Sequence, residues 1–280
     1  MPSNIPQIAL NDGRTIPQLG FGVWQVPDNE ATQAVHHAIE AGYRLIDTAE
    51  GYNNEEGVGR AIRECGVARE DLFITSKLRN GAHAFDQAMA AFDETQRKLS
   101  LDYLDMFLIH WPVPEQDKYV DAWKALVKLQ EQGRVRSIGV SNFLPEHLDR
   151  VIEATGVVPA VNQIELHPKY QQRDVRDAHR QRNIQIECYS PLGSGAVLKD
   201  ETIASIADKH GKSVAQVILR YLLDQDVIVI PKSTHAERIQ NNIDVFGFSL
   251  DDEDRKKIDA LDDPKNGKTG GFPETMNSLF

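Results

Sequence analysis

Short apolar segments alternate with longer helical segments along most of the chain. The short segments are apolar throughout, which is typical of parallel strands that are buried on both faces. Glycines such as Gly42, Gly133 and Gly211 close several of the longer segments, where a helix commonly ends. The pattern predicts strands at residues 44–46, 72–76, 106–109, 137–140, 160–163, 185–188 and 227–230, with a further one at 245–246. It predicts helices at residues 30–41, 54–65, 84–98, 119–132, 145–154, 172–182, 201–210, 213–225, 236–242 and 251–261.

This strand–helix unit recurs about eight times without a break in composition, so we expect one domain over residues 1–280. The repeat favours the α/β class and a closed (β/α)8 TIM barrel, with an open doubly wound sheet as the rival. No Gly-x-Gly-x-x-Gly loop follows a strand, because Gly20-Phe21-Gly22 and Gly193-Ser194-Gly195 lack the third glycine. The first of these also precedes the predicted barrel.

Both ends of the chain are expected outside the repeat. An N-terminal β-hairpin is predicted at residues 7–10 and 14–16, because the intervening Asn11-Asp12-Gly13 tolerates the positive φ of a tight turn. Residues 262–280 are rich in Gly, Pro and Lys, and we expect them to form a C-terminal loop.

The composition narrows the class of protein. The chain has 280 residues, of which 41% are hydrophobic and 26% charged, enough to bury the core of a barrel. Its net charge of -11 and pI of about 5.3 argue against nucleic acid or anionic membranes as partners. Only two cysteines occur, which suits a reducing compartment. The N-terminus lacks signal-peptide features and no apolar run approaches the roughly 20 residues of a membrane helix, so we expect a cytoplasmic protein.

Polar side chains follow the predicted strands, and in a (β/α)8 barrel these strand ends meet at one mouth. Asp47 follows the first strand, Lys77 the second and His110 the third, and Tyr52 lies on the loop after Asp47. A phenol with a pKa near 10 is a weak acid, but a nearby ammonium group favours the phenolate and so lowers that pKa. We therefore expect Lys77 to acidify Tyr52, with Asp47 holding Lys77 in place. His110 would orient or polarise a carbonyl oxygen.

Taken one at a time, these residues have ordinary structural explanations. Asp47 or Lys77 could be a helix cap or part of a surface ion pair, Tyr52 a loop anchor, and His110 a packed core residue. No His and Cys residues have the spacing of metal ligands, so no metal site is predicted, and no Gly-x-Ser-x-Gly elbow indicates a serine nucleophile. The later strands are followed by Ser141 and Asn142, by Gln163, by Tyr189 and Ser190, and by Lys232 and Ser233.

Three long stretches resemble the aldo-keto reductase family. They are residues 42–59, which include Asp-Thr-Ala and Asn-Glu-Glu-Gly-Val-Gly, residues 101–112, which end in Ile-His-Trp-Pro, and residues 230–233 followed by Arg238. Residues 139–143 and 161–168 also match, so the likeness covers nearly the whole chain. Within the family, residues 8–13, residues 155–163 and the short loop after Pro112 are most similar to bacterial 2,5-diketo-D-gluconate reductases.

The resemblance implies reduction of aldehydes and ketones, such as small dicarbonyls and keto-sugars, with NADPH (NADP+) as cofactor. Tyr52 would protonate the carbonyl oxygen, aided by Asp47, Lys77 and His110. Amide and hydroxyl groups of Ser141, Asn142 and Gln163 would hold the nicotinamide carboxamide, and Tyr189 would stack on its ring. The other implied cofactor contacts are Gly22, Val23, Trp24, Ser190, Leu192, Gly193, Lys232, Ser233, Thr234, Arg238, Asn241 and Asn242.

Lys232, Ser233 and Arg238 would bind the adenosine 2′-phosphate. The planar fork of arginine suits a phosphate, and an adjoining helix N-terminus adds a favourable dipole. This local positive pocket on an acidic protein favours NADPH over NADH. If this motif stood alone, a solvated face would be the preferred explanation of Lys232 and Arg238. His235 and Asn241 depart from the family pattern, which leaves the strictness of cofactor selectivity open.

The expected substrate-binding residues are Trp24, Arg79, His110, Trp111 and Phe272. Arg79 stands where the family commonly has an aromatic residue, so it would form a cationic wall suited to an acidic sugar, or else point to solvent. The two tryptophans and Phe272 would be apolar walls, although ordinary packing would explain each of them.

Other functions remain open beside carbonyl reduction. One is an NADPH-binding redox-sensing or regulatory subunit with little turnover, which the intact set of Asp47, Tyr52, Lys77 and His110 argues against. A second is a lyase or isomerase that uses Lys77 as a Schiff-base amine, and a third is a structural protein that reuses the fold. The charge pattern indicates no strong interface, so we expect a monomer that acts on a small-molecule carbonyl.

Overall fold

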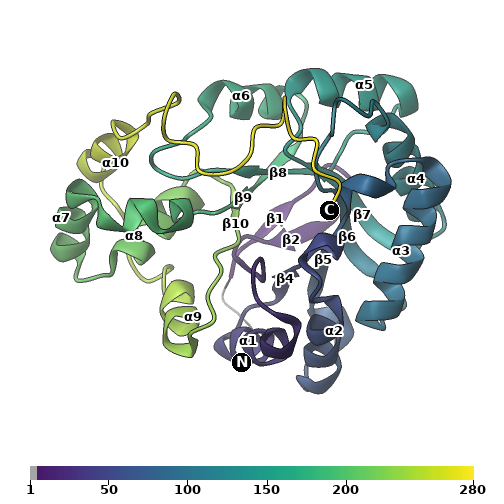
Figure 1. The fold of residues 1–280 in the computed structure, drawn as a ribbon. Helices are drawn as coiled ribbons and strands as arrows, with labels where there is room; N and C mark the ends of the chain where they lie inside the picture. The colour runs from purple at the N-terminus through teal and green to yellow at the C-terminus, as the bar shows by residue number, and fades with distance from the viewer. Residues whose placement is uncertain (1–4) are drawn as a thin grey trace.

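The computed structural model describes residues 5–280, and its centre is a barrel of eight parallel strands (Figure 1). The strands are, in spatial order, β3 (Gly20–Gly22), β4 (Leu45–Asp47), β5 (Phe73–Leu78), β6 (Leu104–Ile109), β7 (Val135–Ser141), β8 (Val161–Glu165), β9 (Gln185–Tyr189) and β10 (Ile228–Val229). The ends of the sheet meet where Leu19 bridges Val229, whose N–H donates to the Gln18 carbonyl at 2.9 Å. This closure confirms the (β/α)8 barrel and rules out the open sheet.

Helices surround the barrel between successive strands (Figure 1). They are α1 (Asp28–Ala41), α2 (Glu55–Glu64), α3 (Phe85–Leu99), α4 (Tyr119–Glu131), α5 (Pro145–Thr155), α6 (Arg173–Gln181), α7 (Glu201–His210), α8 (Val214–Leu223), α9 (Ala236–Ile243) and α10 (Asp252–Asp259). Short 3-10 turns are η1 (Glu50–Tyr52), η2 (Arg69–Asp71), η3 (Asn80–Ala82) and η4 (Gly193–Lys199). The predicted helices, and the strands predicted from 44–46 to 227–230, all lie within two residues of these bounds. Within residues 5–280, no helix has the length and apolar character needed to cross a membrane.

The predicted N-terminal hairpin is present and closes the far end of the barrel. It consists of β1 (Gln7–Ala9) and β2 (Thr15–Pro17), which pair antiparallel with Ile8 opposite Ile16. Ile16 and Leu10 are buried against the apolar side chains inside the barrel. The hairpin therefore covers one end of the barrel, and the carboxyl ends of the strands form the opposite end.

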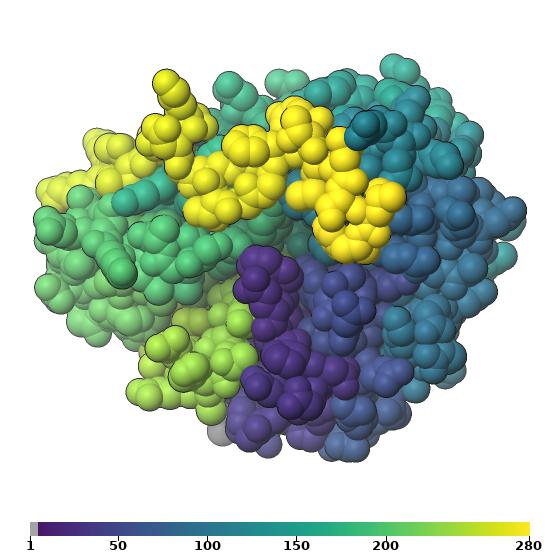
Figure 2. All heavy atoms as spheres, in the orientation of Figure 1, coloured from purple at the N-terminus to yellow at the C-terminus, as the bar shows by residue number. Residues whose placement is uncertain are grey.

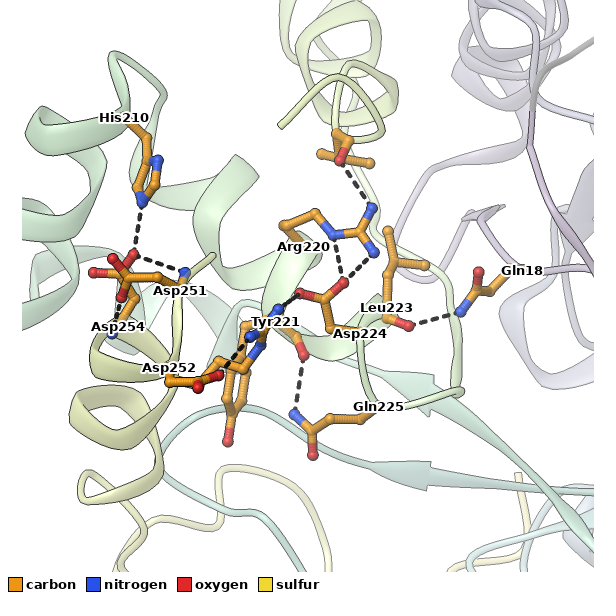
Figure 3. Close-up of polar contacts among 12 residues, drawn as sticks. Gln18, His210, Arg220, Tyr221, Leu223, Asp224, Gln225, Asp251, Asp252 and Asp254 are labelled. Atoms are coloured by element: carbon orange, nitrogen blue, oxygen red, sulfur yellow. Dashed lines mark hydrogen bonds and ion pairs between the residues drawn. The ribbon is translucent and has the colours of Figure 1, made fainter. Parts of the chain in front are cut away.

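Two strand predictions were wrong. Gly20–Gly22, placed before the barrel from its sequence, is the first barrel strand, and it pairs with β4. Its glycines give no hydrophobic pattern, but the close packing of the strand requires Gly20. A Cβ at this position would lie 2.5 Å from the Leu45 side chain, which is too close for any other residue. Residues 245–246 form no strand. The Val245 carbonyl instead accepts a hydrogen bond from Arg220, which Figure 3 shows paired with Asp224 near the end of α8.

Strand residues alternate between two buried layers. Outward-facing residues such as Ile46, Ile74 and Phe107 pack against the helices. Inward-facing residues form a second apolar cluster within the barrel, which includes Leu45, Phe73, Met106, Leu108, Val161 and Ile228. Because the side chains of a strand alternate, the inward position at the carboxyl end of each strand lies above this cluster, at the mouth. Asp47 and Lys77 occupy two of these positions.

The C-terminal segment 262–280, predicted as a loop, contains no helix or strand and runs across the mouth of the barrel (Figure 2, yellow). Several hydrogen bonds attach it, one group near its middle and another at its end. The backbone N–H of Thr269 donates to Glu165 at the end of β8 at 2.6 Å, and the Asn80 side chain donates to the Ser278 carbonyl at 2.8 Å. The segment therefore covers part of the opening formed by the strand ends.

Gly139→Ala on β7 should destabilise the barrel. A Cβ at this position would lie 2.6 Å from the Val161 carbonyl oxygen on the neighbouring strand, so the two strands would have to separate. We expect the free energy of unfolding to fall by about 1–3 kcal/mol in urea titrations. Gly247→Ala, where nothing lies within 4 Å of the new methyl group, is the matched control. Its free energy should change by less than about 0.5 kcal/mol, and equal values for the two variants would contradict this packing.

Candidate active site

Lys77 joins two of the other predicted catalytic residues at the barrel mouth. Its ammonium group is fully buried and donates to Asp47 Oδ1 at 2.6 Å, to the Thr48 carbonyl at 2.9 Å and to the Tyr52 hydroxyl at 3.2 Å. These contacts use all three N–H donors of the group. Since the Tyr52 oxygen accepts from Lys77, its own hydrogen is available to a further acceptor.

The loop that carries Tyr52 is fixed by Asn54. Asn54 precedes α2, but its side chain forms no capping hydrogen bond with that helix. Its amide instead donates to the carbonyls of Val23 and Val26, both at 2.9 Å, and accepts from the Thr48 hydroxyl at 2.7 Å. A fully buried asparagine thus ties the chain after β4 to the chain after β3, and it holds η1 over the mouth.

The electrostatics differ in one respect from the sequence-based prediction. Burial alone would lower the pKa of Lys77, but Asp47 and Tyr52 outweigh it and raise the pKa to about 12. Burial also raises the pKa of Tyr52, and although Lys77 lowers it, the net shift is upward. The expected net acidification of Tyr52 is therefore wrong for the protein alone, because desolvation and the Asp47 charge exceed the effect of the ammonium group.

His110 is a neutral group beside this cluster. Burial and the Lys77 charge hold its pKa well below the usual range. Its ring meets the Tyr52 ring edge-on, with 5.5 Å between centroids, and its buried Nδ1 has no hydrogen-bond partner among residues 5–280. A neutral imidazole here can exchange a hydrogen bond with a polar ligand without adding a charge.

Asp47, Tyr52 and His110 face a cavity of about 380 Å³, and Lys77 lies behind Asp47 and Tyr52 without lining it. Polar groups from the later strands join them there. Tyr189 donates to Asn142 Oδ1 at 2.8 Å, Asn142 donates to the His110 carbonyl at 3.1 Å, and Gln163 donates to Asp47 Oδ2 at 2.9 Å. The predicted site residues that line the cavity are Gly22, Trp24, Asp47, Tyr52, His110, Trp111, Ser141, Asn142, Gln163, Tyr189, Ser190 and Lys232.

The other residues predicted to contact the cofactor lie outside this cavity. The Val23 side chain is fully buried. Leu192 and Gly193 lie at the start of η4, and Gly193 has a φ of +55° with the Val197 side chain packed against it. The remaining ones surround the N-terminus of α9 or lie on it, namely Ser233, Thr234, Arg238, Asn241 and Asn242.

The α9 side of the site carries free positive charge. Lys232 and Arg238 are exposed, and neither forms an ion pair with any residue from 5 to 280. Ser233 is buried, and its hydroxyl accepts from the His235 N–H at 3.1 Å just before the helix begins. Two unpaired cations beside a helix N-terminus suit a phosphate group.

Two of the expected substrate-binding residues do not line the cavity. The Arg79 guanidinium forms an ion pair with Glu50, and Arg79 does not line the cavity. Phe272 is 57% exposed and also lies outside it. Tail residues that the sequence did not single out take their place as walls, among them Gly271, Met276 and Phe280. The Phe280 ring meets the His110 ring edge-on, with 5.3 Å between centroids.

Two buried acids were also missed. Glu165 ends β8 and accepts hydrogen bonds from Thr269 and Gly270, and Glu187 lies in the middle of β9. Both are fully buried. A carboxyl group within an apolar strand was the signal that could have identified them, because a buried charge requires a partner or a proton.

Comparison with known proteins agrees with this geometry. A sequence profile described as the aldo/keto reductase family matches residues 18–263. The chain is 48% identical to glyoxal reductase from Bacillus subtilis, with 99% of each chain covered. It is 47% identical to methylglyoxal reductase DkgA from Escherichia coli, over 94% of this chain and 96% of that protein.

Solved structures agree with the fold and with the family. A Gox0644 mutant crystallised in complex with NADPH matches with a TM-score of 0.94 and 48% identity, over 98% of this chain and 99% of that one. The apo form of Gox0644 matches with a TM-score of 0.93, over 97% of this chain and 98% of that one. The family resemblance found in the sequence motifs is thereby confirmed, and the chain belongs to the aldo/keto reductase family of oxidoreductases.

Proposed function

We propose that this protein reduces small aldehydes and ketones with NADPH, and that Tyr52 is the general acid. The observation that carries the proposal is the contact between the Tyr52 hydroxyl and the buried Lys77 ammonium, 3.2 Å apart beside the cavity. An acid must lie within hydrogen-bond reach of the group that it protonates, and a carbonyl in this cavity can approach Tyr52.

The four catalytic residues would divide the work as follows. Tyr52 stays protonated at neutral pH because burial raises its pKa, so it is ready to donate. Lys77 would stabilise the phenolate left after donation, and Asp47 would hold Lys77 charged and in place. Neutral His110 would orient the carbonyl oxygen. When bound, the reduced nicotinamide supplies the hydride.

The polar groups around the cavity have the chemistry that the cofactor needs. Ser141, Asn142 and Gln163 offer the hydroxyl and amide groups suited to a carboxamide, and Tyr189 offers an aromatic face. The unpaired Lys232 and Arg238 at α9 would hold the 2′-phosphate, with Ser233 beside them. The NADPH complex of Gox0644, at 48% identity, supports the same cofactor.

The cavity favours small, uncharged dicarbonyl substrates. Lys232 is the one cationic side chain among its lining residues within the described chain, and we assign it to the cofactor. Trp24 and Trp111 supply apolar walls. The glyoxal and methylglyoxal reductases among the relatives support dicarbonyls. Reduction of a keto-sugar such as 2,5-diketo-D-gluconate stays a prediction. Arg79, the cationic side chain expected to bind its acid group, forms an ion pair with Glu50 instead.

The Schiff-base alternative is less consistent with the site. A Lys77 whose pKa is raised to about 12 stays an ammonium, and an ammonium is not a nucleophile. A cytoplasmic monomer stays our prediction from the sequence, and the acidic charge predicts neither nucleic acid nor an anionic membrane as partner.

Tyr52→Phe should reduce kcat for methylglyoxal by about 100-fold or more, because the proton donor is removed. The Kd of NADPH, measured by fluorescence quenching, should stay unchanged. Tyr103→Phe removes a hydroxyl from a ring that stacks on Arg69 and Arg136 outside the cavity, and it should retain full activity. Unchanged turnover in Tyr52→Phe would refute the acid role.

Arg238→Ala should raise the Kd of NADPH by about 10- to 100-fold, since a charge-assisted phosphate contact is lost. The Kd of NADH, which lacks the 2′-phosphate, should change little. Arg180→Ala on α6 removes another exposed arginine away from the cavity and serves as the control. Equal weakening of both cofactors by Arg238→Ala would place the 2′-phosphate elsewhere.

A further inference from the structure

Glu187 is a fully buried acid in the middle of β9. It lies on the face of β9 that points into the barrel, as does Tyr189 two residues on, while Ile186 and Cys188 pack toward the helices. Neither carboxyl oxygen has a hydrogen-bond partner among residues 5–280. Gln163 is its register partner on β8, but the Gln163 amide donates to Asp47.

The groups around Glu187 leave its charge unbalanced. Asp47 from β4, Lys77 from β5 and Tyr52 from η1 interact with it electrostatically, as does the adjacent Cys188 thiol. From β10 it faces only the register partner Ile228. Lys77 is the single cation in this group, and Asp47 already holds it at 2.6 Å. A second carboxylate without a partner is strongly unfavourable in such a place, so the neutral acid is the stable form.

The same conclusion follows from the pKa. Burial, with the Asp47 charge added, raises the pKa of Glu187 from 4.5 to about 8, while the neighbouring Gln163 amide, whose hydrogen bond goes to Asp47, and the Lys77 charge oppose the shift. Ionised Glu187 in turn raises the pKa of Tyr52. One proton on Glu187 therefore affects the strength of the acid at the cavity.

We propose that Glu187 is a positioning residue that must be protonated for activity, because its ionisation makes Tyr52 a weaker proton donor. The neutral acid leaves Asp47 and Lys77 as a balanced pair beneath Tyr52. Loss of its proton to solvent adds a negative charge to this buried cluster and opposes formation of the phenolate. This inference rests on the proposed acid role of Tyr52.

The first test is the pH dependence of kcat at saturating NADPH and methylglyoxal. In the wild type the rate should fall as the pH rises through about 8, the pKa of Glu187. Glu187→Gln has nearly the same shape as the neutral acid and cannot ionise, so this fall should be lost. Glu187→Asp, which restores an acid, should bring back a fall with rising pH. The same alkaline fall in Glu187→Gln would overturn the proposal.

The second test needs no turnover. A group that binds its proton more tightly in the folded state stabilises the protein at low pH. That stabilisation is lost as the pH rises from the group's unfolded pKa to its folded pKa. The free energy of unfolding of the wild type should therefore decline from about pH 4.5 to about pH 8 more steeply than that of Glu187→Gln. Equal slopes would show that Glu187 is ionised throughout and would overturn the proposal.

A third measurement keeps the inference testable even if Glu187→Gln does not fold. Infrared spectra of the wild type should contain a protonated carboxyl band at about pH 6 that is lost by about pH 9, and its absence at the lower pH would overturn the proposal. Full turnover in Tyr52→Phe would instead remove the proposed function. The stability and infrared results would then still report the protonation of Glu187, so the two failures are distinguishable.

Discussion

Lys77 carries a full positive charge in a part of the barrel that water does not reach, and the site is built around satisfying it. Its exposed fraction is 0%, and its three donors go to Asp47, Thr48 and Tyr52. A buried ammonium is tolerated only when its desolvation is compensated by such contacts. Asp47 ends β4, and Thr48 and Tyr52 lie on the segment that follows it, while Lys77 belongs to β5. The register between β4 and β5 therefore determines whether these groups meet.

The rest of the fold holds β4 and β5 in this register. The hairpin covers the far end of the barrel, the inner apolar cluster fills its middle, and the carboxyl ends of the strands form the mouth where the site lies. Asn54 then fixes the loop that brings Tyr52 over Lys77. Packing, closure and loop geometry thus combine to place one phenol oxygen within reach of one ammonium group.

Local pattern was enough to predict much of this. Apolar strands followed by polar residues indicated the barrel and the positions of Asp47, Lys77 and His110, because strand alternation and βα repeats are local properties. What failed depended on contacts between distant segments. Gly20–Gly22 is a strand only because β4 and Pro231 supply its partners. Arg79 faces Glu50, and the sequence alone does not reveal that choice of partner.

Charge balance was the other property that sequence reasoning missed. The effect of Lys77 on Tyr52 was foreseen, but the opposing effect of desolvation depends on how deeply the hydroxyl lies, which only the folded chain determines. Glu187 was passed over because an acid in a strand carries no periodic signal. Its importance follows from the folded structure, where Lys77 is the single cation beside two buried acids, Asp47 and Glu187.

The loop that crosses the mouth shapes the substrate cavity separately from the residues that carry out the chemistry. Gly271, Met276 and Phe280 shape the cavity, yet they belong to neither the barrel nor its helices. They take no part in the strand register or in the hydrogen bonds of Lys77 to Asp47, Thr48 and Tyr52. Substrate preference can therefore diverge among related proteins, or be redesigned, while the chemistry that acts on the carbonyl stays the same.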